Sequence, residues 1–145
     1  MAGEIVIFDI DGTLADISAR EHHVRRKPRN WDAFFRGMAE DKIIQPIAHL
    51  CNTLYDAGFH VVLCSGRPDN YRQVTEEWLE RHKLRYHQLL LRPAGDRRSD
   101  AIIKREMLDR LDRARISFIV EDRSRVVKMW RDEGFICLQC APGEF

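Results

Sequence analysis

The sequence has no excess of charge of one sign, because 24 Lys and Arg side chains are balanced by 23 Asp and Glu side chains in 145 residues. A formal net charge of +1 excludes overall charge as a guide to partners, so contact with nucleic acid would need a local basic patch. Long apolar runs are also absent, and no stretch approaches the length of a membrane-spanning helix. The first residues, MAGEIVIFD, contain no basic leader, and we therefore expect a cytoplasmic protein with no membrane contact.

Cysteine is scarce, with four residues, and the sequence contains no internal repeat and no low-complexity tract. Cys137 and Cys140 have the spacing of half a zinc site or of a redox pair, but they lie in FICLQC, which is typical of a β-strand. Residues three apart in a strand point to opposite faces, so we favour packing over metal or redox chemistry for these thiols. The P-loop pattern GxxxxGK[ST] is absent too, so the sequence contains no phosphate-cradling kinase loop of this type.

The sequence does contain an alternation of short apolar runs and amphipathic segments. The expected strands are rich in Val and Ile, as strands buried on both faces are, and cover residues 4–8, 59–64, 86–91, 116–120 and 135–139. Segments with helical spacing lie between them, at 45–58, 70–82, 99–111 and 124–134. We predict one α/β domain over residues 1–145, with a mostly parallel five-stranded sheet flanked by helices.

One segment, at about residues 16–44, interrupts this alternation after the first strand. It is too long for a simple connection, and insertions of this length in compact domains tend to be lids or binding loops. Four side chains of its basic run could contact a nucleic-acid backbone: Arg25, Arg26, Lys27 and Arg29. Three aromatic side chains could stack on a base: Trp31, Phe34 and Phe35. The alternatives are a solvated basic loop and a helix packed on the body, and we interpret His22 and His23 as loop residues rather than metal ligands.

Polar side chains follow three of the expected strands. Asp9 and Asp11 follow the first strand, SGR (65–67) follows the second, and ED (121–122) follows the fourth, while Lys104 lies on the third expected helix. Because ligands of open α/β sheets bind at the carboxyl ends of the strands, we expect these groups to lie together. Carboxylates with a hydroxyl, a guanidinium and an ammonium suit a Mg²⁺ ion and a phosphate, since Mg²⁺ takes oxygen ligands.

These four motifs, in this order, resemble those of the haloacid dehalogenase (HAD) superfamily phosphatases. The resemblance implies a Rossmann-like HAD fold in which the first and fourth strands are adjacent, so that Asp9, Asp11 and Asp122 meet. It implies that Asp9 is the nucleophile that accepts a phosphoryl group as an aspartyl-phosphate, and that Asp11 is the general acid and then the base. Lys104 would neutralise charge that develops in the transition state. The alternative is a capped turn beside surface ion pairs.

The same resemblance implies the other ligands. Mg²⁺ would be held by Asp9, Asp11 and Asp122, with Glu121 in support. Contacts to the substrate and its phosphate would come from Thr13 through its backbone amide, and from Ser65, Gly66, Arg67, Asp100 and Arg123.

A narrower resemblance covers nearly the whole chain. The stretches SGRPDNYRQVTEEWL, GDRRSDAIIKREML and EDRSRVVKMWRDEGFICLQCAPGEF are similar to the 3′-phosphatase domain of bacteriophage-type polynucleotide kinase-phosphatases. Arg67 and Asp100 match residues that support catalysis in that family. Arg123 matches the arginine that follows the acidic pair. Glu121 departs from the pattern, because the family prefers Asp there, and this puts the metal geometry in question. Without a kinase loop, the chain would correspond to the phosphatase half.

We therefore expect a Mg²⁺-dependent phosphomonoesterase that removes 3′-phosphates from nucleic-acid ends, in phage-like nucleic-acid repair or nucleotide metabolism. One alternative is a 5′(3′)-nucleotidase that acts on (deoxy)nucleoside monophosphates. Another is a non-enzymatic module that binds a phosphate or a partner protein, although such a module would not need Asp11 as an acid. The sequence indicates neither an oligomeric state nor a preference between DNA and RNA.

Overall fold

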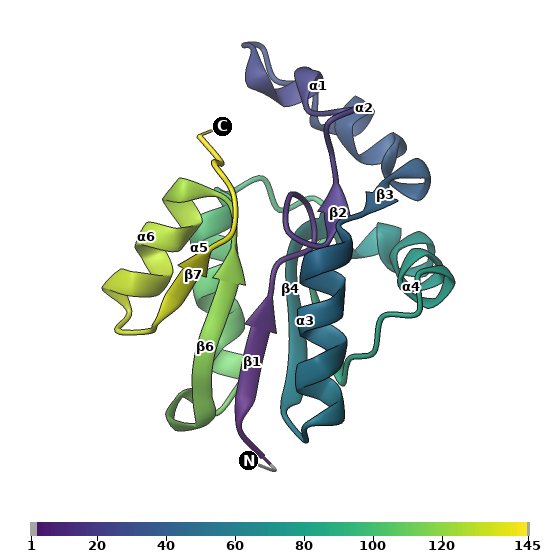
Figure 1. Ribbon diagram of the computed structural model, residues 1–145. Helices are drawn as coiled ribbons and strands as arrows, with labels where there is room; N and C mark the ends of the chain where they lie inside the picture. Colours follow the sequence, from purple (N-terminus) through teal and green to yellow (C-terminus); the bar gives the residue numbers. More distant parts are fainter. Residues whose placement is uncertain (1–2, 145) are drawn as a thin grey trace.

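A five-stranded parallel sheet forms the centre of the molecule in the computed structural model, which describes residues 3–144. The strands are β1 Ile5–Phe8, β4 His60–Pro68, β5 Gln88–Arg92, β6 Ile116–Glu121 and β7 Cys137–Gln139. Their order is β5-β4-β1-β6-β7, so β1 lies between β4 and β6 (Figure 1). The predicted fold class is confirmed, including the contact between the first and fourth expected strands, and every pairing in this sheet is parallel.

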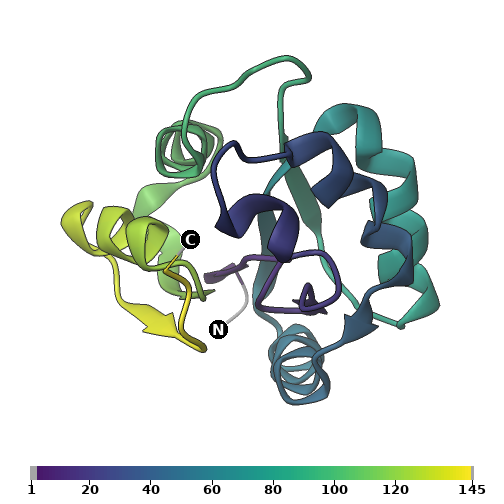
Figure 2. The same cartoon turned by 90° about the horizontal axis from the view of Figure 1, so that it is seen from above.

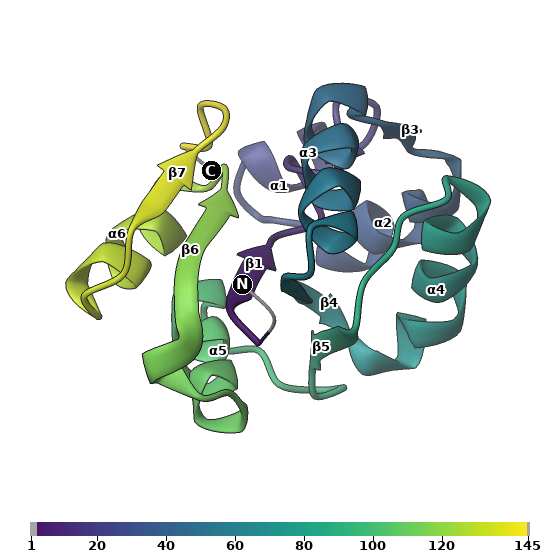
Figure 3. The ribbon, with the colours of Figure 1, turned by 60° about the horizontal axis from the view of Figure 1, so that its bottom comes forward.

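Helices cover both faces of the sheet, because side chains alternate between two cores along each strand. In β1, Val6 and Phe8 pack into one core and Ile5 and Ile7 into the other. The first core is covered by α3 Gln45–Asp56 and α4 Arg72–Arg81, and the second by α5 Asp100–Met107 and α6 Ser124–Asp132. Figures 1 and 3 show α3 and α5 on opposite sides of the sheet.

Two of the three tryptophans occupy these cores. Trp78 of α4 and Trp130 of α6 are both fully buried. Cys51, Cys64 and Cys137 are buried and Cys140 is exposed, and all four are free thiols. Packing therefore accounts for Cys137 but not for Cys140, whose Sγ lies 3.7 Å from Thr13 Oγ1.

The insertion after β1 folds into a small unit of its own. Two short antiparallel strands, β2 Ala15–Asp16 and β3 Lys42–Ile43, form its base. Between them lie α1 His22–Arg25, α2 Trp31–Arg36 and a 3₁₀ turn, Met38–Glu40. Its apolar side chains, which also contact Tyr71 and Val74, are Ile17, Val24, Trp31, Phe34, Phe35 and Met38. Seen from above, it extends across the carboxyl ends of the strands (Figure 2).

None of the helices in residues 3–144 combines the length and the apolar character that a bilayer crossing requires.

Candidate active site

The site is built around Asp9, the first residue after β1 at the carboxyl edge of the sheet. Asp9 is only 5% exposed, and Lys104 Nζ donates hydrogen bonds to Asp9 Oδ1 at 2.6 Å and to Glu121 Oε1 at 2.9 Å. Carboxylate oxygens of Asp9, Glu121 and Asp122 lie within 4.8 Å of one another. The neighbouring strands β1 and β6 and helix α5 thus bring together three carboxylates and one ammonium group.

The charges of this acidic cluster are not balanced by Lys104 alone. Burial raises the pKa of Glu121 to about 8 and that of Asp122 to about 10, and the charge of Asp9 contributes to both shifts. Burial opposes the charged form of Lys104, but Asp9 and Glu121 raise its pKa well above the ordinary value. The raised pKa values of Glu121 and Asp122 mean that their charged forms are costly at this site, and a bound cation would offset that cost and favour ionisation of all three carboxylates. Converging oxygen donors are the ligands that Mg²⁺ prefers, so the cluster fits such an ion.

The turn after β1 lets these groups approach closely. Gly12 has φ +87°, and a Cβ at this position would lie 2.0 Å from Asp122 Oδ2. The Thr13 hydroxyl lies 3.1 Å from Asp9 Oδ2 and 3.3 Å from Asp122 Oδ1. The Thr13 amide donates to the Ile10 carbonyl at 3.1 Å, and its contact with phosphate stays a prediction. In the structure it is the hydroxyl that contacts the site, where it orients two carboxylates.

Asp11 lies apart from the acidic cluster and contacts two guanidinium groups. Arg67 Nη2 donates to Asp11 Oδ1 at 2.7 Å, and Arg20 Nη2 donates to the same oxygen at 2.6 Å. Burial acts to raise the pKa of Asp11, but the charges of Arg67 and Arg20 outweigh burial and hold this pKa well below its usual range. The Asp11 side chain is therefore ionised and lies outside the set of converging carboxylates, and its part as a metal ligand stays a prediction.

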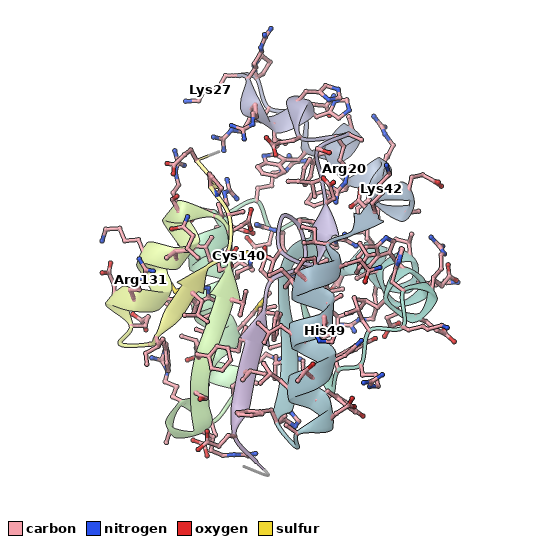
Figure 4. The ribbon with its side chains drawn as sticks, in the orientation of Figure 1. Arg20, Lys27, Lys42, His49, Arg131 and Cys140 are labelled. Carbon is pink, nitrogen blue, oxygen red and sulfur yellow. The ribbon has the colours of Figure 1, made fainter. Side chains whose placement is uncertain are left out.

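Arg20 and its partner Asp41 belong to the site but were not identified from the sequence. Arg20 is 3% exposed; its Nε donates to Asp41 Oδ1 at 2.9 Å, and its Nη1 donates to the Phe34 carbonyl at 3.0 Å. Figure 4 shows Arg20 where the insertion meets the body of the molecule, so it ties the insertion to Asp11. The sequence did contain one signal for Arg20. Ile17, Arg20 and Val24 follow helical spacing, so Arg20 shares a face with apolar residues, where an arginine is unusual.

The predicted phosphate-binding residues fall into two groups. Gly66, Asp100 and Arg123 line a cavity above the acidic cluster, whereas Ser65 and Arg67 are buried and do not line it. The Ser65 hydroxyl accepts a hydrogen bond from the Arg67 backbone amide at 3.1 Å. Asp100 accepts one from Arg92 Nη2 at 2.9 Å, and a Cβ on Gly66 would lie 1.8 Å from Asp100 Oδ1. Gly66 is therefore required for the approach of α5 to β4.

The cavity has a volume of about 730 Å³ and opens above Asp9 and Asp122. Its walls come from the insertion, the segment after β4, the segment from β5 to α5, and the start of α6. Four aromatic side chains line it: Trp31, Phe34, Phe35 and Tyr71. The Arg123 guanidinium carbon lies 5.7 Å from the centre of the Trp31 ring. Its size and mixed lining are those of a site for a small molecule or the end of a polymer.

Comparisons with known proteins agree with this geometry. The family described as the polynucleotide kinase PNKP phosphatase domain matches residues 3–145. A chain in the structure of the Pnkp1/Rnl/Hen1 complex is 32% identical with a TM-score of 0.83; the match covers 99% of this chain and 48% of that one. A chain in the Pnkp1/Rnl/Hen1 RNA repair complex is 33% identical with a TM-score of 0.82, with 98% and 44% covered. This chain thus spans less than half the length of these two solved chains.

A more distant structure supports the fold alone. A predicted phosphatase from Clostridium acetobutylicum is 17% identical, with a TM-score of 0.68 over 96% of this chain and 85% of that chain.

Proposed function

Because the chain belongs to the family of PNKP phosphatase domains, which are HAD-type phosphatases, we propose that it removes 3′-phosphates from nucleic-acid ends. The observation that carries this proposal is the contact of Asp9 with Lys104, at 2.6 Å, beneath a cavity whose walls also carry arginine side chains. Two solved relatives belong to complexes of Pnkp1, Rnl and Hen1, one of them described as an RNA repair complex. RNA ends are therefore among the proposed substrates.

The proposed reaction has two steps, and the phosphoryl group passes through Asp9. An Asp9 carboxylate oxygen attacks phosphorus, the bond from phosphorus to the 3′ oxygen breaks, and that oxygen takes a proton from Asp11. In the second step Asp11 takes a proton from water, the oxygen of this water attacks phosphorus, and Asp9 and inorganic phosphate are released. Lys104 holds Asp9 in position and offsets charge on the transferred group.

Asp11 must change its contacts to play this part. The contacts with Arg67 and Arg20 keep it ionised, and an ionised carboxylate cannot donate a proton. Asp11 lines the cavity, whereas Arg67 and Arg20 are buried and do not. We propose that, when substrate binds, Asp11 turns from these arginines toward the cavity, takes up a proton from solvent and donates it to the 3′ oxygen.

We propose Mg²⁺ as the cofactor, held by Asp9 and Asp122 with Glu121 in support. When bound, it would neutralise the acidic cluster and polarise the phosphate oxygens. Glu121 has a longer side chain than the Asp that the family prefers. Lys104 donates a hydrogen bond to its Oε1 atom, so one of its two carboxylate oxygens already has a protein partner.

The insertion at about 16–44 is proposed to act as a small lid that forms one wall of the substrate site. Trp31 is its half-buried aromatic residue at the cavity, and we propose that it contacts a nucleobase. The expected cytoplasmic location and the expected role in phage-like repair stay predictions.

The function is tested with one oligonucleotide that carries a single phosphate at either its 3′ or its 5′ end, so that length and charge are matched. With Mg²⁺, we expect inorganic phosphate to be released at least about tenfold faster from the 3′-phosphorylated form than from the 5′-phosphorylated form. The loss of one charge-assisted contact by the wrongly placed phosphate is enough for a difference of this size. Nucleoside monophosphates are assayed beside them.

Each of the other outcomes would contradict the proposal. Release from mononucleotides but from neither oligonucleotide would support the nucleotidase alternative. No release from any of these compounds, with phosphate still bound, would support a non-enzymatic binding module.

A further inference from the structure

Three arginines gather at the outer end of the cavity, beyond the acidic cluster. Arg29 comes from the insertion, and Arg123 and Arg125 come from the start of α6. We call these residues the outer arginines. The Arg29 Nε atom is buried and has no hydrogen-bond partner among the described residues. A buried, unsatisfied donor is costly, and a ligand with an acceptor oxygen would remove this cost.

The outer arginines also repel one another. Burial lowers the pKa of Arg29, and the positive charges of Arg123 and Arg125 lower it further. Asp100 accepts from Arg92 at 2.9 Å and lies 3.6 Å from Arg123 Nη1, so it offsets part of this positive charge, and Asp96 accepts from Arg98 at 2.8 Å. An anion between the outer arginines would offset this repulsion, and arginine forks match phosphate oxygens well.

The cavity continues outward past Arg29. A second cavity, of about 340 Å³, is lined by Pro28, Arg29, Asn30, Trp31, Asp32 and Arg97. Four of these residues also line the first cavity: Arg29, Trp31, Asp32 and Arg97. A chain that enters with its end at Asp9 therefore has a path outward between Arg29 and Arg97. Other members of the basic run, Arg26 and Lys27, line neither cavity, and Figure 4 shows Lys27 at the far end of the insertion.

We propose that the outer arginines bind a second phosphate, the one on the 5′ side of the nucleotide whose 3′-phosphate is removed. This inference rests on the proposed function and narrows its substrate class. The protein would prefer a 3′-phosphate that has a neighbouring phosphate, as in an oligonucleotide end or a nucleoside 3′,5′-bisphosphate, over a nucleoside 3′-monophosphate. Trp31, which contacts Arg123 and lines both cavities, lies where the nucleoside between the two phosphates would pass.

The test measures binding without turnover. Calorimetry with the Asp9→Asn protein and Mg²⁺ gives dissociation constants for thymidine 3′-monophosphate and thymidine 3′,5′-bisphosphate. We expect the bisphosphate to bind about tenfold more tightly or better, because it gains charge-assisted contacts. Adding Arg29→Gln should bring the ratio of the two constants toward one. Arg125→Gln, which changes an exposed side chain, should also reduce the ratio.

Arg26→Gln is the matched control, because it makes the same chemical change in the same run away from both cavities, and it should leave the ratio unchanged. Equal binding of the two nucleotides before any arginine is changed would overturn the inference. A ratio that survives both Arg29→Gln and Arg125→Gln would overturn it as well. If the protein preferred the bisphosphate but released no phosphate from 3′-phosphorylated oligonucleotides, the subsite would stand and the proposed function would fail.

Discussion

Replacing Asp9 by Asn is expected to lower phosphate release from a 3′-phosphorylated oligonucleotide by at least about 10⁴-fold, since an amide cannot serve as the attacking carboxylate. The change is nearly isosteric, so the turn at Gly12 and the contact of Thr13 with this side chain should persist. The rate constant is measured in single-turnover experiments with excess protein and Mg²⁺, which separates chemistry from product release.

Asp109→Asn provides the matched control for this experiment. Asp109 is exposed, lies in the 3₁₀ turn Leu108–Arg110 and does not line the cavity, so the same chemical change there should leave the rate within about twofold. Both variants are compared by thermal unfolding. Substantial turnover by a folded Asp9→Asn protein would show that another group, or water directly, attacks phosphorus.

Replacing Asp11 by Asn should produce a loss that depends on the leaving group. Without proton transfer, turnover of a nucleoside 3′-phosphate should fall by about 10²–10⁴-fold, because its alkoxide leaves poorly. An aryl phosphate needs little protonation, so the first turnover should release the phenolate at close to the normal rate. Release should then slow, because the variant also lacks the base that activates water. The measurement is a rapid-mixing burst experiment with both substrates.

The same variant removes one carboxylate from between Arg20 and Arg67, so its stability needs a separate measurement. A second variant, Asp41→Asn, changes another partner of Arg20 without touching the proposed acid. If Asp11→Asn slowed the aryl phosphate burst as much as nucleotide turnover, Asp11 would be a positioning residue rather than the acid.

The sequence predicted the elements of the sheet well, because its strands carry a strong local signal. β1 is an apolar run that ends just before Asp9, and Gly12 follows three residues after Asp9, so both the strand and the turn after it are visible in IVIFDIDGTL. The approach of Asp9 to Asp122 was expected through the family resemblance, which implied that the first and fourth expected strands, β1 and β6, are neighbours.

The contacts of individual side chains were harder to predict, because they depend on the packing of distant segments. The contacts of the Asp11 side chain with Arg20 and Arg67 were not expected, and Arg20 belongs to an insertion with no motif. The sequence also did not indicate which residues of the basic run line the cavity. Of its four cationic residues, Arg29 lines the cavity, and the other three do not.

The most direct test of the account is to identify the residue that carries the phosphoryl group. Protein in excess is mixed with an oligonucleotide that carries ³²P in its 3′-phosphate, with Mg²⁺ present, and the reaction is stopped in acid within milliseconds. We expect radioactivity on the peptide that contains Asp9, and none in the Asp9→Asn protein or after chelation of the metal. Release of labelled phosphate without a labelled protein, or a label on any other residue, would contradict it.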